Sequence, residues 1–280
     1  MSRNIDLQTV SGFGYQWSRF THAELDPEEK QRAFMDYFRI FPWHLLPSDG
    51  GVGADIGCGN GRWSTLVAPR VSHLHMVEAS AHALQIAKQN LSHHPNVSFH
   101  CATIDDLPFP EQSLDFAFAL GVLHHVPDPQ RAVAAIARKL KPGAPFLAYV
   151  YYALDNRPMW FRLLWKLSDI ARRCICRLPN GLRYYVSQLI AAVIYWPLAR
   201  VGRILEKVQC LPDAWPLAYY RDKSFYVMRT DALDRFGTRL EKRFTRRQIQ
   251  AMLESAGFTD VSFSEHQPYW CVVGIRSSVG

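Results

Sequence analysis

The sequence predicts an α/β fold: a doubly wound, mostly parallel sheet with an antiparallel C-terminal hairpin and a helical insertion. Three observations support this. A glycine-rich loop, Gly57-x-Gly59-x-Gly61, directly follows an apolar run. An acid, Glu78, ends the next apolar run, about 20 residues after the loop, as in a βαβ unit. Further apolar runs then alternate with helical segments, which is the pattern of parallel strands covered by helices on both faces.

The segment Gly51–Trp63, GVGADIGCGNGRW, predicts a strand that ends near Asp55, a tight turn and the start of a helix. Glycines at such a turn allow positive φ and let the backbone approach a ligand closely. The helix start offers unpaired N–H groups and a positive dipole end. The spacing is not the G-x-G-x-x-G of dinucleotide sites, and the Lys-Ser/Thr of a phosphate loop is absent. A ligand with a carboxylate or a ribose is therefore expected. The alternative is a glycine-rich turn of some other α/β protein.

Glu78, in MVEAS, is placed to accept hydrogen bonds from both ribose hydroxyls; the alternative is a surface acid that caps the next helix. The further elements alternate as a parallel α/β chain requires. They are expected as a helix at Trp63–Pro69, strands at His73–Val77 and within Asp115–Val126, a helix at Arg131–Leu140 and a strand at Pro145–Tyr152.

Taken in order, the glycine loop, Glu78, LPFP, LHHVPDP and LKPG resemble the class I S-adenosylmethionine (SAM)-dependent methyltransferases, in the ubiquinone and menaquinone biosynthesis branch. The resemblance covers about residues 50–150 well and 230–275 loosely. It implies a Rossmann-like SAM-binding sheet, with S-adenosylhomocysteine as product. Many relatives hold the adenine amino group with a loop Asp; this chain has Thr103 there, so Asp105 or Asp106 is the alternative. The cofactor residues that the resemblance implies are Asp55, Gly57, Gly59, Gly61, Glu78, Ala79, Ser80, Thr103, Ile104, Asp105 and Leu120.

Three regions are expected. They are an N-terminal helical aromatic lid at 1–48, a SAM-binding core at 49–152 and 229–280, and a basic, apolar helical insertion at 153–228 that caps the substrate. The N-terminal region contains a predicted helix, Pro27–Phe38. A helix at Thr245–Gly257 begins with a capping box made by Thr245 and Gln248. The segments Phe258–His266 and Tyr269–Arg276 read as the antiparallel pair.

The net charge of +7 comes from one segment. Residues 151–210 carry ten Lys and Arg against three acids, and the rest of the chain is balanced. Pro158–Leu178 predicts a basic amphipathic helix, and a second lies near Tyr184–Val208, interrupted by Pro197. The uncharged stretch Tyr184–Ala199 is too short and too polar to span a membrane.

Three interpretations of this insertion stay open. It is a helical cap packed on the core with a solvated basic face, a lid that selects the substrate, or an interfacial segment at 158–208 that contacts anionic lipid. A nucleic-acid partner is not expected, because the aromatic residues lie on the apolar face and the D/N-P-P-Y motif of base-amino methyltransferases is absent. The polar N-terminus predicts a cytoplasmic protein, with a peripheral position at the inner face of a membrane as the alternative.

His124 and His125 follow the fourth strand, at the sheet edge where the methyl group would lie. Positioning supplies most of the catalysis of methyl transfer from a sulfonium, but a hydroxyl acceptor also needs a base. Some sugar O-methyltransferases of this branch use a His-His pair in this way, whereas other relatives keep one histidine only as a structural hydrogen-bonder. The expected substrate contacts are Tyr15, Tyr151, Tyr152 and Asp231. No metal site is expected, because the sequence has no evident cluster of metal-ligating residues and its six cysteines are scattered.

These features predict SAM-dependent methyl transfer to a small hydrophobic or amphipathic molecule, with oxygen as the favoured acceptor. A natural product, glycan, quinone or lipid intermediate would suit. One alternative is a cyclisation of SAM that releases methylthioadenosine. Two others are an RNA methyltransferase that uses the basic segment and a SAM-binding module without catalysis.

Overall fold

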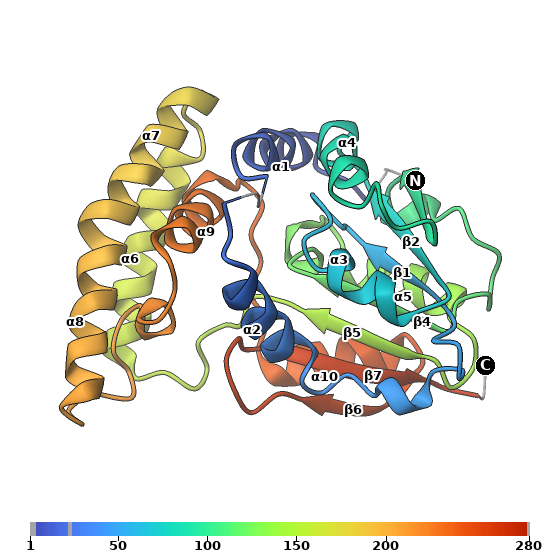
Figure 1. Ribbon diagram of the computed structural model, residues 1–280. Coiled ribbons are helices and arrows are strands. Elements are labelled where there is room, and N and C mark those ends of the chain that lie inside the picture. The colour runs from blue at the N-terminus through green and yellow to red at the C-terminus, as the bar shows by residue number, and fades with distance from the viewer. Residues whose placement is uncertain (1–3, 22–23, 279–280) are drawn as a thin grey trace. The chain divides into compact units, whose positions relative to one another are not determined.

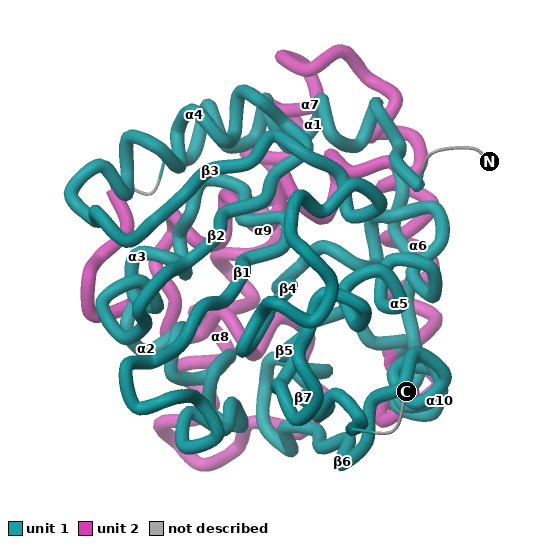
Figure 2. Tube along the Cα trace, turned by 90° about the vertical axis from the view of Figure 1, so that its right-hand side faces the viewer, with its two compact units in different colours: residues 1–21, 31–153, 240–280 teal, residues 22–30, 154–239 magenta. Residues whose placement is uncertain are grey.

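The computed structural model describes residues 4–21 and 24–278. The chain divides into two compact units (Figure 2). Unit 1 contains residues 1–21, 31–153 and 240–280, and unit 2 contains residues 22–30 and 154–239. The sequence places 229–239 in the SAM-binding core, but these residues cluster with unit 2, because they belong to a helix that packs within that unit.

Unit 1 is built on a seven-stranded sheet in the order β3-β2-β1-β4-β5-β7-β6 (Figure 1). The first five strands run parallel, and β7 is antiparallel to both β5 and β6. The strands are β1 (Val52–Ile56), β2 (His73–Glu78), β3 (Val97–Cys101), β4 (Phe116–Leu120), β5 (Pro145–Tyr149), β6 (Phe258–Phe263) and β7 (Cys271–Arg276). The predicted fold class, with its antiparallel C-terminal pair, is confirmed.

The helices of unit 1 begin with side-chain caps where the sequence offers them. Asp6, Ser80, Asp128 and Thr245 each accept a hydrogen bond from the backbone N–H three residues on. Thr245 and Gln248 form the predicted capping box. The helices are α1 (Leu7–Arg19), α2 (Pro27–Phe38, whose first four residues belong to unit 2), α3 (Ser64–Val67), α4 (Ala81–Asn90), α5 (Pro129–Lys139) and α10 (Arg246–Ser255), with short turns η1 (Trp43–Leu45), η2 (Ala68–Arg70), η3 (Ile104–Asp106) and η4 (Leu123–His125).

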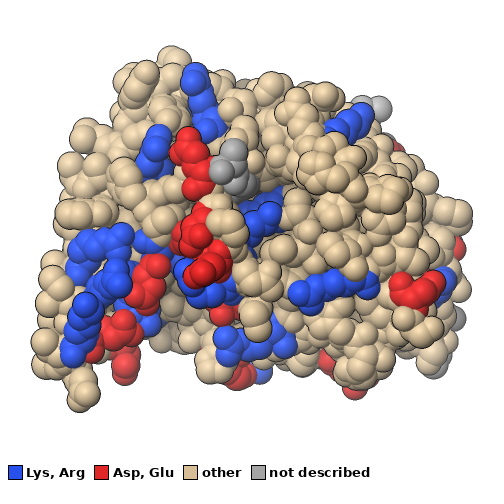
Figure 3. Space-filling model, in the orientation of Figure 1, with Lys and Arg blue, Asp and Glu red and all other residues tan. Residues whose placement is uncertain are grey.

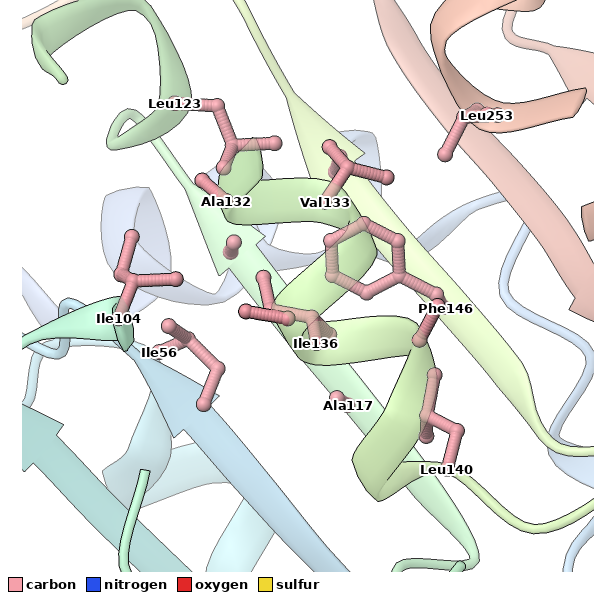
Figure 4. Close-up of a cluster of buried hydrophobic side chains, with 14 of the residues drawn as sticks. Ile56, Ile104, Ala117, Leu123, Ala132, Val133, Ile136, Leu140, Phe146 and Leu253 are labelled. Carbon is pink, nitrogen blue, oxygen red and sulfur yellow. The ribbon is translucent and has the colours of Figure 1, made fainter. Parts of the chain in front are cut away.

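Alternate residues of the central strands supply two hydrophobic cores, one on each face of the sheet. In β4, Ala117 and Ala119 join the core under α5 and α10, whereas Phe116 and Phe118 join the core under α2, α3 and α4. Figure 4 shows the first core, where Val133 and other side chains of α5 lie over the strands. Burial on both faces explains why the strands read as continuous apolar runs, and it holds their carboxyl ends in fixed positions.

Unit 2 is helical, and its longest element is one continuous helix from Asn180 to Lys207 (Figure 1). Pro197 does not interrupt this helix as predicted, because a π-helical turn lies directly before it and accommodates the missing N–H. The uncharged stretch Tyr184–Ala199 lies within this longer helix, which by length and composition alone is apolar enough to cross a membrane, with a mean hydropathy of 1.2 over an 18-residue window. The elements are α6 (Met159–Ile175), α7 (Asn180–Ile190), the π turn η5 (Ala191–Tyr195), α8 (Trp196–Lys207), η6 (Ala218–Tyr220) and α9 (Phe225–Gly237).

Candidate active site

A pocket opens at the carboxyl ends of the strands, and every residue that lines it belongs to unit 1. The strand order reverses between β1 and β4, which is where open α/β sheets bind ligands. The glycine loop, the ends of β2, β3 and β4, and helix α1 provide the lining. The predicted site residues that line the pocket are Asp55, Gly57, Gly59, Glu78, Ala79, Thr103, Ile104, Leu120 and His125.

The glycine loop has the geometry that its sequence predicts. Gly57, Gly59 and Gly61 have φ angles of 76°, 55° and 79°, a region that other residues rarely adopt. A Cβ on Gly57 would lie 2.5 Å from the Val122 side chain, so the loop also approaches the β4 end closely. Gly61 does not line the pocket; a Cβ there would lie 2.5 Å from Leu91, so this glycine instead allows α4 to pack against the loop.

Two acids face this loop, and burial alters the pKa of each. Asp55 is almost fully buried and accepts a 2.5 Å hydrogen bond from the Ser64 hydroxyl. Burial raises the Asp55 pKa to about 7, despite the Ser64 hydrogen bond and with a contribution from the nearby Glu78. Burial also raises the Glu78 pKa; its carboxylate accepts hydrogen bonds from the Gly59 and Ser80 N–H groups, at 3.0 Å and 2.8 Å. Protonation of these acids is therefore sensitive to any ligand with positive charge.

Helix α1 covers one side of the pocket, and the sequence predictions did not include a helix there. Thr9, Phe13 and Trp17 line the pocket from successive turns of this helix. The Thr9 hydroxyl is buried and has no hydrogen-bond partner among the described residues. Tyr15, a predicted substrate residue, is not part of the lining, and Arg19 lies over its ring at 5.3 Å. The four-residue spacing of Thr9, Phe13 and Trp17 after the capping Asp6 is the signal that would have revealed the helix.

The loop after β3 binds the N-terminal segment. Asp105 accepts a 2.8 Å hydrogen bond from the Asn4 backbone N–H and a second, also 2.8 Å, from the Arg131 guanidinium. The Asn4 side chain in turn bonds both backbone groups of Asp128. Asp105 does not line the pocket, and neither does Asp106, whereas Thr103 does. Asp105 therefore fixes the segment that leads into α1. Asn4, which does line the pocket, was not predicted from the sequence.

The two histidines of η4 have different surroundings. His125 lines the pocket, its ring lies 4.9 Å from that of Phe13, and its Nδ1 lies 2.7 Å from the Leu240 carbonyl oxygen. His124 is fully buried and does not line the pocket. The backbone N–H of Tyr151 donates to its Nδ1 at 3.3 Å, and its ring stacks on the Tyr151 ring at 3.8 Å. Burial, together with the charges of His125 and Arg243, holds the His124 pKa well below its ordinary value.

The other predicted residues lie outside the lining. Tyr151 stacks on His124, and Tyr152 packs its ring near Tyr269 and Trp270. Ser80 caps α4. Asp231 lies on α9 in unit 2, where it accepts a 3.0 Å hydrogen bond from the Tyr220 hydroxyl. Among the residues that the structure describes, no group of three or more metal-ligating side chains has a geometry suited to a metal ion.

Comparisons with known proteins agree with this architecture. Residues 54–148 match the family model described as a methyltransferase domain. Ubiquinone biosynthesis O-methyltransferase of Hahella chejuensis is 36% identical over 164 residues, which are 55% of this chain and 63% of that protein. Methyltransferase nsrG of Aspergillus novofumigatus is 31% identical over 116 residues, 41% of this chain and 44% of that protein. The chain thus spans less than two thirds of the length of either relative.

The fold also resembles that of human N-acetylserotonin methyltransferase, which was solved in complex with SAM. The TM-score is 0.51 and the sequence identity 15%, with 97% of this chain and 56% of that protein covered. At this identity the similarity concerns the fold alone.

Proposed function

Since the chain belongs to the class I SAM-dependent methyltransferases, we propose that it transfers the methyl group of SAM to an oxygen atom of a small hydrophobic or amphipathic molecule. The relative from Hahella chejuensis is named an O-methyltransferase, which supports oxygen as the acceptor. Apolar side chains such as Phe13, Leu120 and Val122 in the pocket lining support a substrate with apolar surface. The orientation of the His125 ring is the observation that carries the proposal.

The pocket residues fit SAM, which when bound supplies a methyl group on a positively charged sulfonium, a good leaving group. Asp55 is buried and Glu78 is partly buried, and burial raises the pKa of each; a cationic ligand with hydroxyl donors would stabilise their ionised forms. Glu78, at the end of β2, is the residue that would accept hydrogen bonds from ribose hydroxyls. The buried Thr9 hydroxyl gains a partner from a polar ligand in the pocket, which would remove the cost of leaving it unsatisfied.

His125 is oriented to act as a general base. A carbonyl oxygen only accepts hydrogen bonds, so the 2.7 Å contact with Leu240 requires that Nδ1 carries the hydrogen. The lone pair of the neutral ring then lies on Nε2. That nitrogen would take the proton of the acceptor hydroxyl while the hydroxyl oxygen attacks the methyl carbon. Such catalysis contributes roughly 10²–10⁴-fold to the rate.

His124 has the opposite tautomer. Its Nδ1 accepts from the Tyr151 N–H, so its hydrogen lies on Nε2, which has no partner among the described residues. It is buried away from the pocket, and we assign it a positioning role: it fixes the backbone after β5 and packs against His125 at a ring distance of 4.0 Å. Of the two adjacent histidines, His125 is thus the proposed base and His124 the residue that positions it.

The reaction class can be tested without knowing the substrate. The full chain is incubated with methyl-labelled SAM and a cell extract, and label is counted in the organic, small-molecule, RNA and protein fractions. Label in the organic or small-molecule fraction supports the proposal and yields a product for mass analysis. Label in RNA or protein contradicts it, as does accumulation of methylthioadenosine without labelled acceptor.

The role of His125 is tested with the labelled product as readout. His125→Gln keeps a hydrogen-bond donor for the Leu240 carbonyl but lacks a base, so we expect kcat to fall by roughly 10²–10³-fold. The affinity for SAM, measured by calorimetry, should stay within about twofold, because this residue acts on the acceptor. The matched control is His82→Gln, a change of an exposed histidine on α4. Retention of full kcat by His125→Gln would exclude general-base catalysis at this position.

A further inference from the structure

Helix α6 is oriented with its charged face inward and its apolar face outward. Asp169 and Arg172 are buried, whereas Leu163, Leu167 and Ile170 are 60%, 57% and 62% exposed. The carboxylate of Asp169 accepts from the Nε atoms of Arg172 and of its exposed neighbour Arg173, at 2.7 Å and 2.8 Å. These bonds neutralise the buried carboxylate within the helix. The rotation of the helix is fixed by Arg172, which donates to the Thr238 and Arg239 carbonyls; turning the apolar face inward would break these bonds.

The continuous helix Asn180–Lys207 also leaves large hydrophobic residues exposed, although Ala191, Tyr195 and Ala199 of its inward stripe join a small hydrophobic core with α9. A stripe of mostly polar or small residues faces inward, and large hydrophobic residues face outward. Arg183 lies in the inward stripe and donates to the Gly237 carbonyl at 3.0 Å. The inward residues are Arg183, Ser187, Ala191, Tyr195, Ala199 and Gly202, and outward ones include Leu182, Tyr185, Leu189, Val193, Trp196 and Ile204.

The inward faces of both helices contact the same partner, α9. Arg172 donates to the Thr238 carbonyl at 2.9 Å and Arg183 to that of Gly237, so both guanidinium groups bind the carboxyl end of α9. Arg229 of α9 also donates to Gln188 and Tyr184 of α7. Since these contacts occupy the polar faces within unit 2, the apolar faces are the surfaces that unit 2 presents outward. Exposed apolar surface of this extent on a soluble protein marks an interaction site.

The charges beside this apolar surface are of one sign on α6. Its exposed charged residues, Arg162, Lys166 and Arg173, are all basic, because its single acid is buried. Residues 158–208 as a whole carry nine Lys and Arg against two acids. In the part of the view that α7 and α8 occupy in Figure 1, Figure 3 shows uncharged surface with both basic and acidic side chains beside it, in accord with the ion pairs that Arg203 and Arg221 make with Asp222 and Glu206. A second copy of the chain would bring the same positive charge against this face, which disfavours self-association.

We propose that the outward faces of α6 and of Asn180–Lys207 bind the surface of an anionic lipid bilayer, lying in the interfacial plane. Apolar side chains enter the boundary between headgroups and acyl chains, and flanking Lys and Arg contact anionic headgroups. Exposed tryptophans, Trp160 and Trp196, suit this depth. If the helix Asn180–Lys207 spanned the bilayer, its uncharged stretch Tyr184–Ala199 would be shorter than the roughly 20 residues that a span needs. Arg183 or Arg200 would then enter the hydrocarbon, so the interfacial position is favoured. This inference is independent of the proposed methyl transfer.

The test is flotation of the full chain with vesicles of phosphatidylcholine alone or with phosphatidylglycerol added, in the absence of SAM. We expect at least about tenfold stronger partitioning into the anionic vesicles, weakened by salt because headgroup attraction is screened. Equal binding to both vesicle types overturns the charge argument, and no binding to either overturns the proposal. Resistance to alkaline extraction would show that the helix spans the bilayer. Concentration-dependent dimers without lipid binding would show that a second copy of the chain covers this surface. Either result would overturn the proposed interfacial binding.

Two sets of variants separate the apolar and electrostatic contributions. Leu163→Ser with Leu167→Ser should reduce binding about tenfold or more, whereas Leu45→Ser, at an exposed leucine of unit 1, should leave it unchanged. Lys166→Glu with Arg177→Glu should abolish the preference for anionic vesicles, and Lys88→Glu on α4 is its control. All these side chains are exposed, so folding should be unaffected, and circular dichroism verifies this. Wild-type binding by Leu163→Ser with Leu167→Ser would contradict the apolar contribution. An unchanged preference for anionic vesicles in Lys166→Glu with Arg177→Glu would contradict the electrostatic one.

Discussion

Helix α6 of unit 2 and the strands of unit 1 bury opposite kinds of side chain. In unit 1, Leu147 of β5 is fully buried in the core between the sheet and the helices. In unit 2, Leu167 of α6 is 57% exposed, and Arg172 on the same helix has a side chain that is only 7% exposed. An amphipathic pattern therefore gives the period of a helix but not the direction in which its apolar face points. The direction of the apolar face depends on which hydrogen-bonding groups the neighbouring element leaves unsatisfied.

The carboxyl end of α9 is the element that decides the direction in unit 2. The last carbonyl groups of a helix have no partner within it and carry partial negative charge. Arg172 and Arg183 donate to the carbonyls of Gly237, Thr238 and Arg239 at this end. Guanidinium groups satisfy these carbonyls, which leucine side chains cannot do, so the faces of α6 and α7 that carry Arg172 and Arg183 pack inward. The strands of unit 1 satisfy one another along the sheet and can bury their apolar side chains.

The largest effect on stability is expected from Arg172→Met. The change keeps much of the side-chain volume but leaves Asp169 and two carbonyls of unit 2 with fewer partners, which costs about 4 kcal/mol of the free energy of unfolding of this unit. The matched control is Arg173→Met, which removes a bond to the same Asp169 from a side chain that is 67% exposed and should cost less than about 1 kcal/mol. Hydrogen exchange of the α9 amides measures both. Equal losses would mean that the bonds from Arg172 to the Thr238 and Arg239 carbonyls are not what orients α6.

A pair of identical leucine substitutions sharpens the comparison between the units. Leu147→Ala should cost about 3 kcal/mol, because it leaves a cavity in the core of unit 1. Leu167→Ala removes the same atoms from an exposed position and should cost less than about 0.5 kcal/mol. Denaturant unfolding monitored by hydrogen exchange gives each value for its own unit. A large loss for Leu167→Ala would show that the outward face of α6 is packed in solution.

The elements of unit 1 were predictable because local sequence and packing agree there. The apolar runs at β1, β4 and β5, the glycine loop and the capping box at Thr245 each specify one structure, and the sheet buries the runs on both faces. Helix α1, which precedes α2, could not be predicted in this way. Thr9, Phe13 and Trp17 have helical spacing, but glycines and aromatic residues lower the helix propensity of α1, and contacts such as that of Asn4 with Asp105 fix it.

The candidate site was predictable to the extent that backbone geometry requires particular residues. Positive φ requires the glycines, and the end of β2 places Glu78. The distinction between His124 and His125 was not predictable, because it depends on Leu240, which lies 115 residues further along the chain. The contribution of Thr103 rather than Asp105 to the pocket depends in the same way on Asn4 and Arg131. Such long-range hydrogen bonds leave no periodic signal in a single sequence.

The smallest expected effect is on the free energy of unfolding at acidic pH, which should differ between the two units. In unit 1, His75 is half-buried and packs against Phe109, and burial, together with the charges of His73 and His100, lowers its pKa from 6.5 to about 4. The unfolded chain therefore binds a proton near pH 6.5 that the folded chain takes up only near pH 4, and stability is lost as the pH falls through this window. In unit 2, burial acts to raise the Asp169 pKa, but the hydrogen bonds and charges of Arg172, Arg173 and Arg235 outweigh it and lower this pKa, so the contribution of Asp169 is lost only below about pH 3.8.

The measurement is the free energy of unfolding of wild type and His75→Gln between pH 7 and pH 4. Glutamine keeps a hydrogen bond to Ser98 but does not titrate, so the wild type should lose on the order of 1 kcal/mol relative to the variant, after allowance for solvent screening at a half-exposed ring. Asp55, whose pKa is raised to about 7, changes stability in the opposite direction, but it is present in both proteins and cancels. His93→Gln, at an exposed position, is the control. A constant difference between wild type and His75→Gln across this window would show that His75 carries the same charge in the folded and unfolded chains.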